Sequence, residues 1–100
     1  MFVYNVSTKV SLHILNDWLP WQKEEHIPEI LQTGLFSRFE FYQLLEQDDE
    51  EGNTYILQLY TVTEENYHRY IREFAEGLRE KANKKWGYDI INFKTLMKVV

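Results

Sequence analysis

The sequence contains no cysteine, which excludes disulfide bridges, thiolate metal ligands and a cysteine nucleophile. Glycine and proline are scarce, at four and two residues, and no glycine-rich phosphate loop or nucleotide-binding fingerprint is present. A basic excess is also missing, because the formal net charge is −5; we therefore expect no nucleic-acid partner. No apolar run approaches the roughly 18 residues of a membrane span. The N-terminus lacks the pattern of a signal peptide, so we expect a cytoplasmic protein with no membrane partner.

The residues that are present are typical of a single folded domain over residues 1–100. Hydrophobic side chains make up 44% and aromatic side chains 16% of the sequence, which is enough for one core. Apolar residues at every second position predict strands, and spacings of three and four predict helices. The strands are expected at about residues 2–10, 35–46, 54–62 and 89–99, and the helices at about residues 11–33 and 63–86.

This order of elements, β-α-β-β-α-β, predicts an α+β fold of the ferredoxin-like type. Both helices would cover one face of a four-stranded antiparallel sheet; a two-layer sandwich with another strand order is the alternative. Pro20 predicts a kink or break near Leu19, and Pro28 predicts a second, short helical piece. The acidic run of residues 48–51 is expected at a solvated hairpin tip, since it lacks the spaced ligands of a calcium loop.

Two helices can cover only one face of such a sheet, and the other face carries many large apolar residues. A second copy packed sheet to sheet is the simplest cover, so we expect a homodimer; a monomer with an amphipathic open face is the alternative. The residues expected on the open face are Val3, Asn5, Ser7, Phe36, Arg38, Glu40, Tyr42, Ile56, Gln58, Tyr60, Asn92, Lys94 and Leu96.

Several stretches resemble a known group of proteins. The order of elements, the aromatic open face and a histidine near the end of the first helix resemble the dimeric α/β-barrel group of ferredoxin-like folds, which includes small monooxygenases, haem-degrading proteins and isomerases. More narrowly, the chain resembles a bacterial family of about this length that is described only as a domain of unknown function. The motif that carries this resemblance is Trp18-Leu19-Pro20-Trp21 followed by Glu24-Glu25-His26-Ile27-Pro28-Glu29. The resemblance implies the fold and a dimer, but no activity.

The sharpest candidate site lies around His26, which continues the apolar stripe of the first helix. Glu25 and Glu29 are within one helical turn, and a carboxylate can orient an imidazole and raise its basicity, as a general base requires. A structural histidine, hydrogen-bonded to Glu29 or to a backbone carbonyl, is the simpler interpretation. Trp18, Trp21 and Gln22 lie one or two turns earlier and are candidate ligand-binding residues.

Metal binding at His26 and Glu29 would need a third ligand, which the sequence does not indicate, so we expect no metal and no cofactor. His13 and Asp17 have the spacing of a metal pair but also lack a third ligand; we interpret them as a surface pair.

A second candidate site is the polar group on the expected open face. Arg38, Tyr42 and Tyr60 are its candidate ligand-binding residues, together with Glu40, Asn5, Gln58, Asn92 and Lys94. Such groups either form a buried network that specifies the dimer or line a ligand cavity.

Two functions follow from these patterns. The first is a homodimeric binding or interaction module. The second is an enzyme or binding protein of the dimeric-barrel type, with a small organic ligand between the sheet and the first helix near His26. In that second function His26 would act as a base, with Tyr42 or Tyr60 as a donor.

Overall fold

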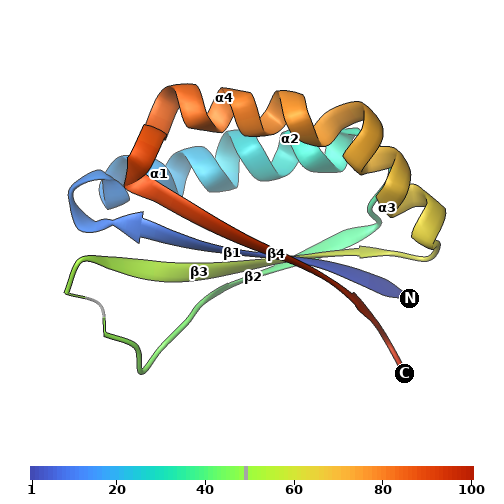
Figure 1. Ribbon diagram of the computed structural model, residues 1–100, viewed down its shortest axis with the longest axis horizontal. Helices are drawn as coiled ribbons and strands as arrows, with labels where there is room; N and C mark the ends of the chain where they lie inside the picture. Colours follow the sequence, from blue (N-terminus) through green and yellow to red (C-terminus); the bar gives the residue numbers. More distant parts are fainter. Residues whose placement is uncertain (49) are drawn as a thin grey trace.

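The structure, a computed structural model that describes residues 1–48 and 50–100, has two layers. Helices cover one face of a four-stranded sheet and leave the other face open (Figure 1). The sheet is antiparallel throughout, in the order β2-β3-β1-β4. This arrangement confirms the predicted α+β, ferredoxin-like fold. The strands are β1 (Phe2–Ser11), β2 (Arg38–Gln43), β3 (Gly52–Thr61) and β4 (Ile90–Lys98).

The first helix of the predicted pattern is continuous: of the kink or break predicted near Leu19, the break does not occur. The helix passes through Pro20 and then widens into one π-helical segment, in which the N–H of Ile27 bonds to the carbonyl of Gln22. Pro28 follows in the first turn of the next piece, where a missing N–H is tolerated. The pieces are a 3-10 turn (Leu12–Ile14), α1 (Leu15–Trp21), the π segment (Gln22–His26) and α2 (Ile27–Gln32).

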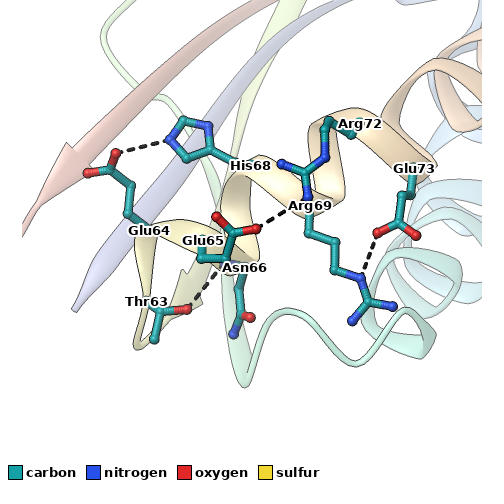
Figure 2. Close-up of polar contacts among 8 residues, drawn as sticks. All are labelled: Thr63, Glu64, Glu65, Asn66, His68, Arg69, Arg72 and Glu73. Atoms are coloured by element: carbon teal, nitrogen blue, oxygen red, sulfur yellow. Dashed lines mark hydrogen bonds and ion pairs between the residues drawn. The ribbon is translucent and has the colours of Figure 1, made fainter.

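The second long helix begins after Thr63, whose Oγ1 accepts a hydrogen bond of 3.2 Å from the N–H of Asn66 (Figure 2). Thr63 is therefore the N-cap of this helix, since Ser and Thr side chains satisfy the free N–H groups of a first turn. On the exposed side, Nε2 of His68 lies 3.0 Å from the Glu64 carboxylate, and ion pairs join Glu65 to Arg72 and Arg69 to Glu73. This second long helix consists of α3 (Glu64–Tyr70), a second π segment (Ile71–Ala75) and α4 (Glu76–Trp86).

The core lies between the two layers and has two adjoining parts. Near the end of the sheet where α3 begins, Tyr4, Leu59 and Tyr70 are buried with the α2 side chains. Toward the other end, Trp18, Trp21 and Trp86 pack over β1 and β3. The indole N–H of Trp86 is the only buried side-chain donor or acceptor without a partner within the described residues.

Strand β4 presents the opposite faces from those expected. Its register pairs Val6 with Lys94 and Thr8 with Asn92, so Asn92, Lys94 and Leu96 face the helices. The open face of β4 instead carries Ile91, Phe93, Thr95 and Met97. The apolar and polar positions of β4 alternate as predicted, but the apolar side is the one that no helix covers. Phe36 is also not on the open face: it precedes β2 and is 4% exposed in the core.

The remaining open-face residues lie where the pattern places them. The register opposes Arg38 to Tyr60, Glu40 to Gln58 and Tyr42 to Ile56 across β2 and β3. The antiparallel pairing of these strands confirms the predicted hairpin; Asp49, in its acidic connection, lies outside the described residues. Among the described residues, no helix has the length and apolarity required to cross a bilayer.

Candidate functional site

A small cavity lies between the helices and the sheet, and His26 is in its wall. Its volume is about 60 Å³, which accommodates about four water molecules or one small organic group. Strands β1, β3 and β4 form the floor of the cavity. The two π segments, α2, α3 and α4 form its roof. The lining residues are Tyr4, Val6, Gln22, His26, Ile30, Leu57, Leu59, Tyr70, Ala75, Leu78, Arg79, Ala82, Asn92 and Lys94.

The widened π turn places His26 and Gln22 in this wall. Both residues belong to the π segment, which is one residue per turn wider than an α-helix. The imidazole of His26 stacks on the indole of Trp21, with ring centroids 4.8 Å apart and planes 18° apart. Gln22 is 4% exposed, yet its amide lines the cavity. The structure shows no hydrogen bond from either side chain within the described residues.

The carboxylate expected to orient His26 has a different partner. Both oxygens of Glu29 accept hydrogen bonds from Nζ of Lys81 on α4, at 2.9 and 3.0 Å. A lysine on the facing helix is a stronger partner for a carboxylate than a neutral imidazole. Glu25 is exposed at the surface. The predicted carboxylate–imidazole hydrogen bond is therefore absent, and His26 faces the cavity without an acid bonded to it.

Burial lowers the pKa of His26 to about 4, and this effect outweighs the opposing influence of Glu29. Lys81 and Lys94 lower it further. At neutral pH the imidazole is uncharged and presents one donor and one acceptor. Burial also raises the pKa of Tyr4 to about 12 and raises the pKa of Tyr70, so both phenols keep their protons.

Among the described residues, Arg79 and Lys94 carry the only formal charges in the cavity wall. Burial lowers the pKa of the Lys94 ammonium, and the nearby Arg79 guanidinium lowers it further. Neither cation has an ion pair with a carboxylate within residues 1–48 and 50–100. Asn92 and Lys94 were expected on the open face and lie on the other one, and Arg79, Tyr4 and Tyr70 were not among the predicted site residues.

The other predicted site residues lie elsewhere. Trp18 is 1% exposed and packs against Phe41 and Tyr55, outside the cavity. The Trp21 indole stacks on the His26 ring and makes a T-shaped contact with Trp86.

Arg38, Tyr42 and Tyr60 lie on the open face of the sheet, away from the helices. The Arg38 guanidinium stacks over the Tyr60 ring at 3.7 Å and bonds to Glu40 at 3.2 Å. The Tyr60 hydroxyl donates to Gln58, whose amide donates to Asn5. The expected open-face polar group is thus a connected network across β2, β3 and β1, without Asn92 and Lys94.

His13 does not pair with Asp17: its Nε2 lies 3.3 Å from Asp89, just before β4. Within the described residues, no three His, Asp or Glu side chains converge as metal ligands.

Comparison with known proteins identifies the family. The sequence matches the family described as "Domain of unknown function (DUF4286)" over residues 1–100. The chain belongs to the DUF4286 family. No curated protein matches the sequence.

Solved structures with similar folds have little sequence identity to this DUF4286 chain. An ethyl tert-butyl ether d (ethd) family protein from Bacillus halodurans aligns over 100% of both chains, with a TM-score of 0.71 and 10% identity. A dimeric ferredoxin-like protein from an uncultured marine organism aligns over 99% of this chain and 94% of its own, with a TM-score of 0.68 and 8% identity. SnoaB, a cofactor-independent oxygenase from Streptomyces nogalater, aligns over 98% of this chain and 92% of its own, with a TM-score of 0.64 and 12% identity. These likenesses show the ferredoxin-like fold.

Proposed function

We propose that this chain is a homodimeric binding module that holds a small organic molecule in the cavity beside His26. The observation that carries the proposal is the cavity wall, in which Gln22, His26 and Lys94 have no hydrogen-bonded partner in the described residues. Among the described residues only the Trp86 indole N–H is buried without a partner, so these polar groups are accessible from the cavity. A few polar side chains among apolar ones in a concave wall are typical of a ligand site.

The cavity favours binding over general-base catalysis. A general base works best when its pKa is near the working pH, and that of His26 is lowered to about 4. No carboxylate is bonded to the imidazole to raise its basicity. We therefore assign His26 the role of a neutral hydrogen-bonding group, next to the amides of Gln22 and Asn92.

Fragment binding followed by NMR tests this function. ¹⁵N-labelled protein is titrated with neutral and charged fragments of roughly four to eight non-hydrogen atoms. We expect the side-chain amide signals of Gln22 and Asn92 to shift in a saturable way. Ala75→Leu adds bulk to the cavity wall and should weaken every hit, whereas Gly77→Leu, on an open part of α4, should not. Absence of cavity shifts with all fragments, or equal binding by Ala75→Leu, would overturn the proposal.

The open sheet face supports the homodimer. Phe93 is 68%, Ile91 54% and Tyr42 48% exposed there, with no helix to cover them. At about 3.3 Å per residue and about 4.8 Å between strands, such a sheet has a face of about 500 Å². Including the relief of the side chains, this approaches the roughly 800 Å² per partner of a stable interface. One protein of similar fold is itself described as dimeric.

Light scattering tests the dimer with a matched pair of variants. The wild type should have twice the 12.2 kDa mass of the chain at micromolar concentration. Phe93→Glu places a charge on the open face and should give a monomer, whereas Tyr88→Glu changes an aromatic that is fully exposed outside the sheet and should remain dimeric. A wild-type monomer, or a dimer that Phe93→Glu leaves intact, would contradict this interface.

A further inference from the structure

The charge of the cavity wall is opposite to that of the chain. Acidic residues outnumber basic ones by 16 to 11 in the sequence, yet no Asp or Glu of residues 1–48 and 50–100 lines the cavity. Its charged members are Arg79, in the first half of α4, and Lys94, on the helix-facing side of β4, and both residues are exposed. A cleft lined by one sign of charge attracts ligands of the opposite sign, and low-dielectric walls strengthen that attraction.

Some basic residues of the helices have acidic partners, and others, including Lys23, Lys84 and Lys85, have none within the described residues. Lys81 binds Glu29, Arg69 binds Glu73 and Arg72 binds Glu65. Arg79 and Lys94 also have no such partner within the described residues. They lie close enough together for the Arg79 guanidinium to lower the pKa of the Lys94 ammonium. A bound anion would relieve this repulsion and supply the missing partner.

The two cations stand where the cavity meets an outer groove. Tyr4, Ala75, Arg79 and Lys94 line both the cavity and this groove, whose volume is about 370 Å³. The rest of the cavity wall is mainly apolar and includes the neutral His26 and Gln22. The groove has one acid, Glu76, which is not in the cavity wall. The arrangement suits a ligand with its charge at the junction and a short apolar part inside.

We propose that the ligand of this cavity is a small organic carboxylate, held by Arg79 and Lys94 with its short apolar chain directed inward. This inference rests on the proposed binding function and adds the chemical class of the ligand. The guanidinium presents paired donors that match a carboxylate, and the ammonium supplies a point charge. At about 60 Å³ the cavity accommodates a chain of about three or four carbons. Inorganic phosphate would leave this apolar volume empty.

The test compares three probes in NMR titrations at constant ionic strength. Sodium butyrate carries the charge and the chain, butyramide has the same shape without the charge, and inorganic phosphate has the charge without the chain. We expect butyrate to shift the Gln22 and Asn92 side-chain amides with an affinity at least about tenfold higher than that of either other probe. The loss of one charge-assisted contact is typically worth about that factor or more.

A matched pair of variants checks the position of the charge. Lys94→Met should weaken butyrate about tenfold or more and leave butyramide unchanged. Lys84→Met removes the same charge from an exposed position on α4 and should bind butyrate like the wild type. The same spectra report whether each variant is folded, and Arg79→Gln is the second variant if Lys94→Met is not.

The other outcomes separate the two proposals. Equal binding of butyrate and butyramide, with no effect of Lys94→Met, would keep the binding function and overturn the carboxylate. Equal shifts with phosphate and butyrate would overturn the organic part of the ligand. Cavity amides that respond to no probe, and to none of the fragments described above, would overturn both proposals.

Discussion

Replacing His26 by phenylalanine should make the protein less sensitive to acid. The pKa of His26 falls from its ordinary value of 6.5 to about 4 in the folded protein because the ring is buried. Between these values the unfolded chain binds a proton that the folded chain does not, so stability falls as pH decreases from 6.5 toward 4. At about 1.4 kcal/mol per pH unit, the wild type should lose roughly 2 kcal/mol between pH 7.5 and pH 5 through this group alone. Phenylalanine keeps an aromatic ring against Trp21 and does not titrate.

Urea unfolding of both proteins at pH 7.5, 6.5, 5.5 and 5.0, at one protein concentration, measures this difference. The stability of the wild type relative to His26→Phe should decrease steadily over that range, by roughly 2 kcal/mol. His68→Phe is the control, because it removes an exposed imidazole from α3. Parallel curves for wild type and His26→Phe would show that the imidazole is not buried in the folded state, and the assignment of His26 to the cavity wall would be refuted.

Three further substitutions test the fold around the cavity. Leu59→Ala removes a fully buried side chain from the cavity floor and should cost about 3–4 kcal/mol in urea unfolding; a loss below about 1 kcal/mol would place Leu59 outside the core. Thr63→Ala removes the N-cap of α3 and should cost about 1 kcal/mol, whereas Thr63→Ser should be neutral within error. Gly52→Ala puts a Cβ against the backbone carbonyl of Val10 and should lower stability by more than about 1 kcal/mol in thermal melts; an unchanged melting temperature would contradict the close pairing of β1 and β3 there.

Much of the fold could be predicted because local patterns matched their final environment. The alternation in β1 and β3 placed Tyr4 and Leu59 on the covered face. The second long helix was predicted to begin at about residue 63, and Thr63 is its N-cap. Strand β4 shows where this reasoning fails. Alternation tells which residues share a face but not which face is covered. Phe93 and Lys94 lie opposite to a hydrophobic-inside assignment because β4 is an edge strand, and its helix-facing residues Asn92 and Lys94 stay exposed.

The site was predictable in part. The helical stripe correctly brought His26 inward, and Gln22 lies beside it in the cavity wall. The partner of Glu29 was not predictable, since Lys81 reaches it from another helix and the relative rotation of two packed helices is a tertiary property. Arg79 was missed for the same reason: on a helix with many exposed charges, nothing in the local sequence distinguishes the one that faces β4.

A crystal structure of the protein grown with sodium butyrate shows directly whether the cavity beside His26 is a binding site. We expect one butyrate per chain in the cavity, with its carboxylate on Arg79 and Lys94 and its methyl end toward His26. Butyrate bound only elsewhere on the surface, or a cavity closed by its own side chains at saturating butyrate, would show that the cavity is not a binding site.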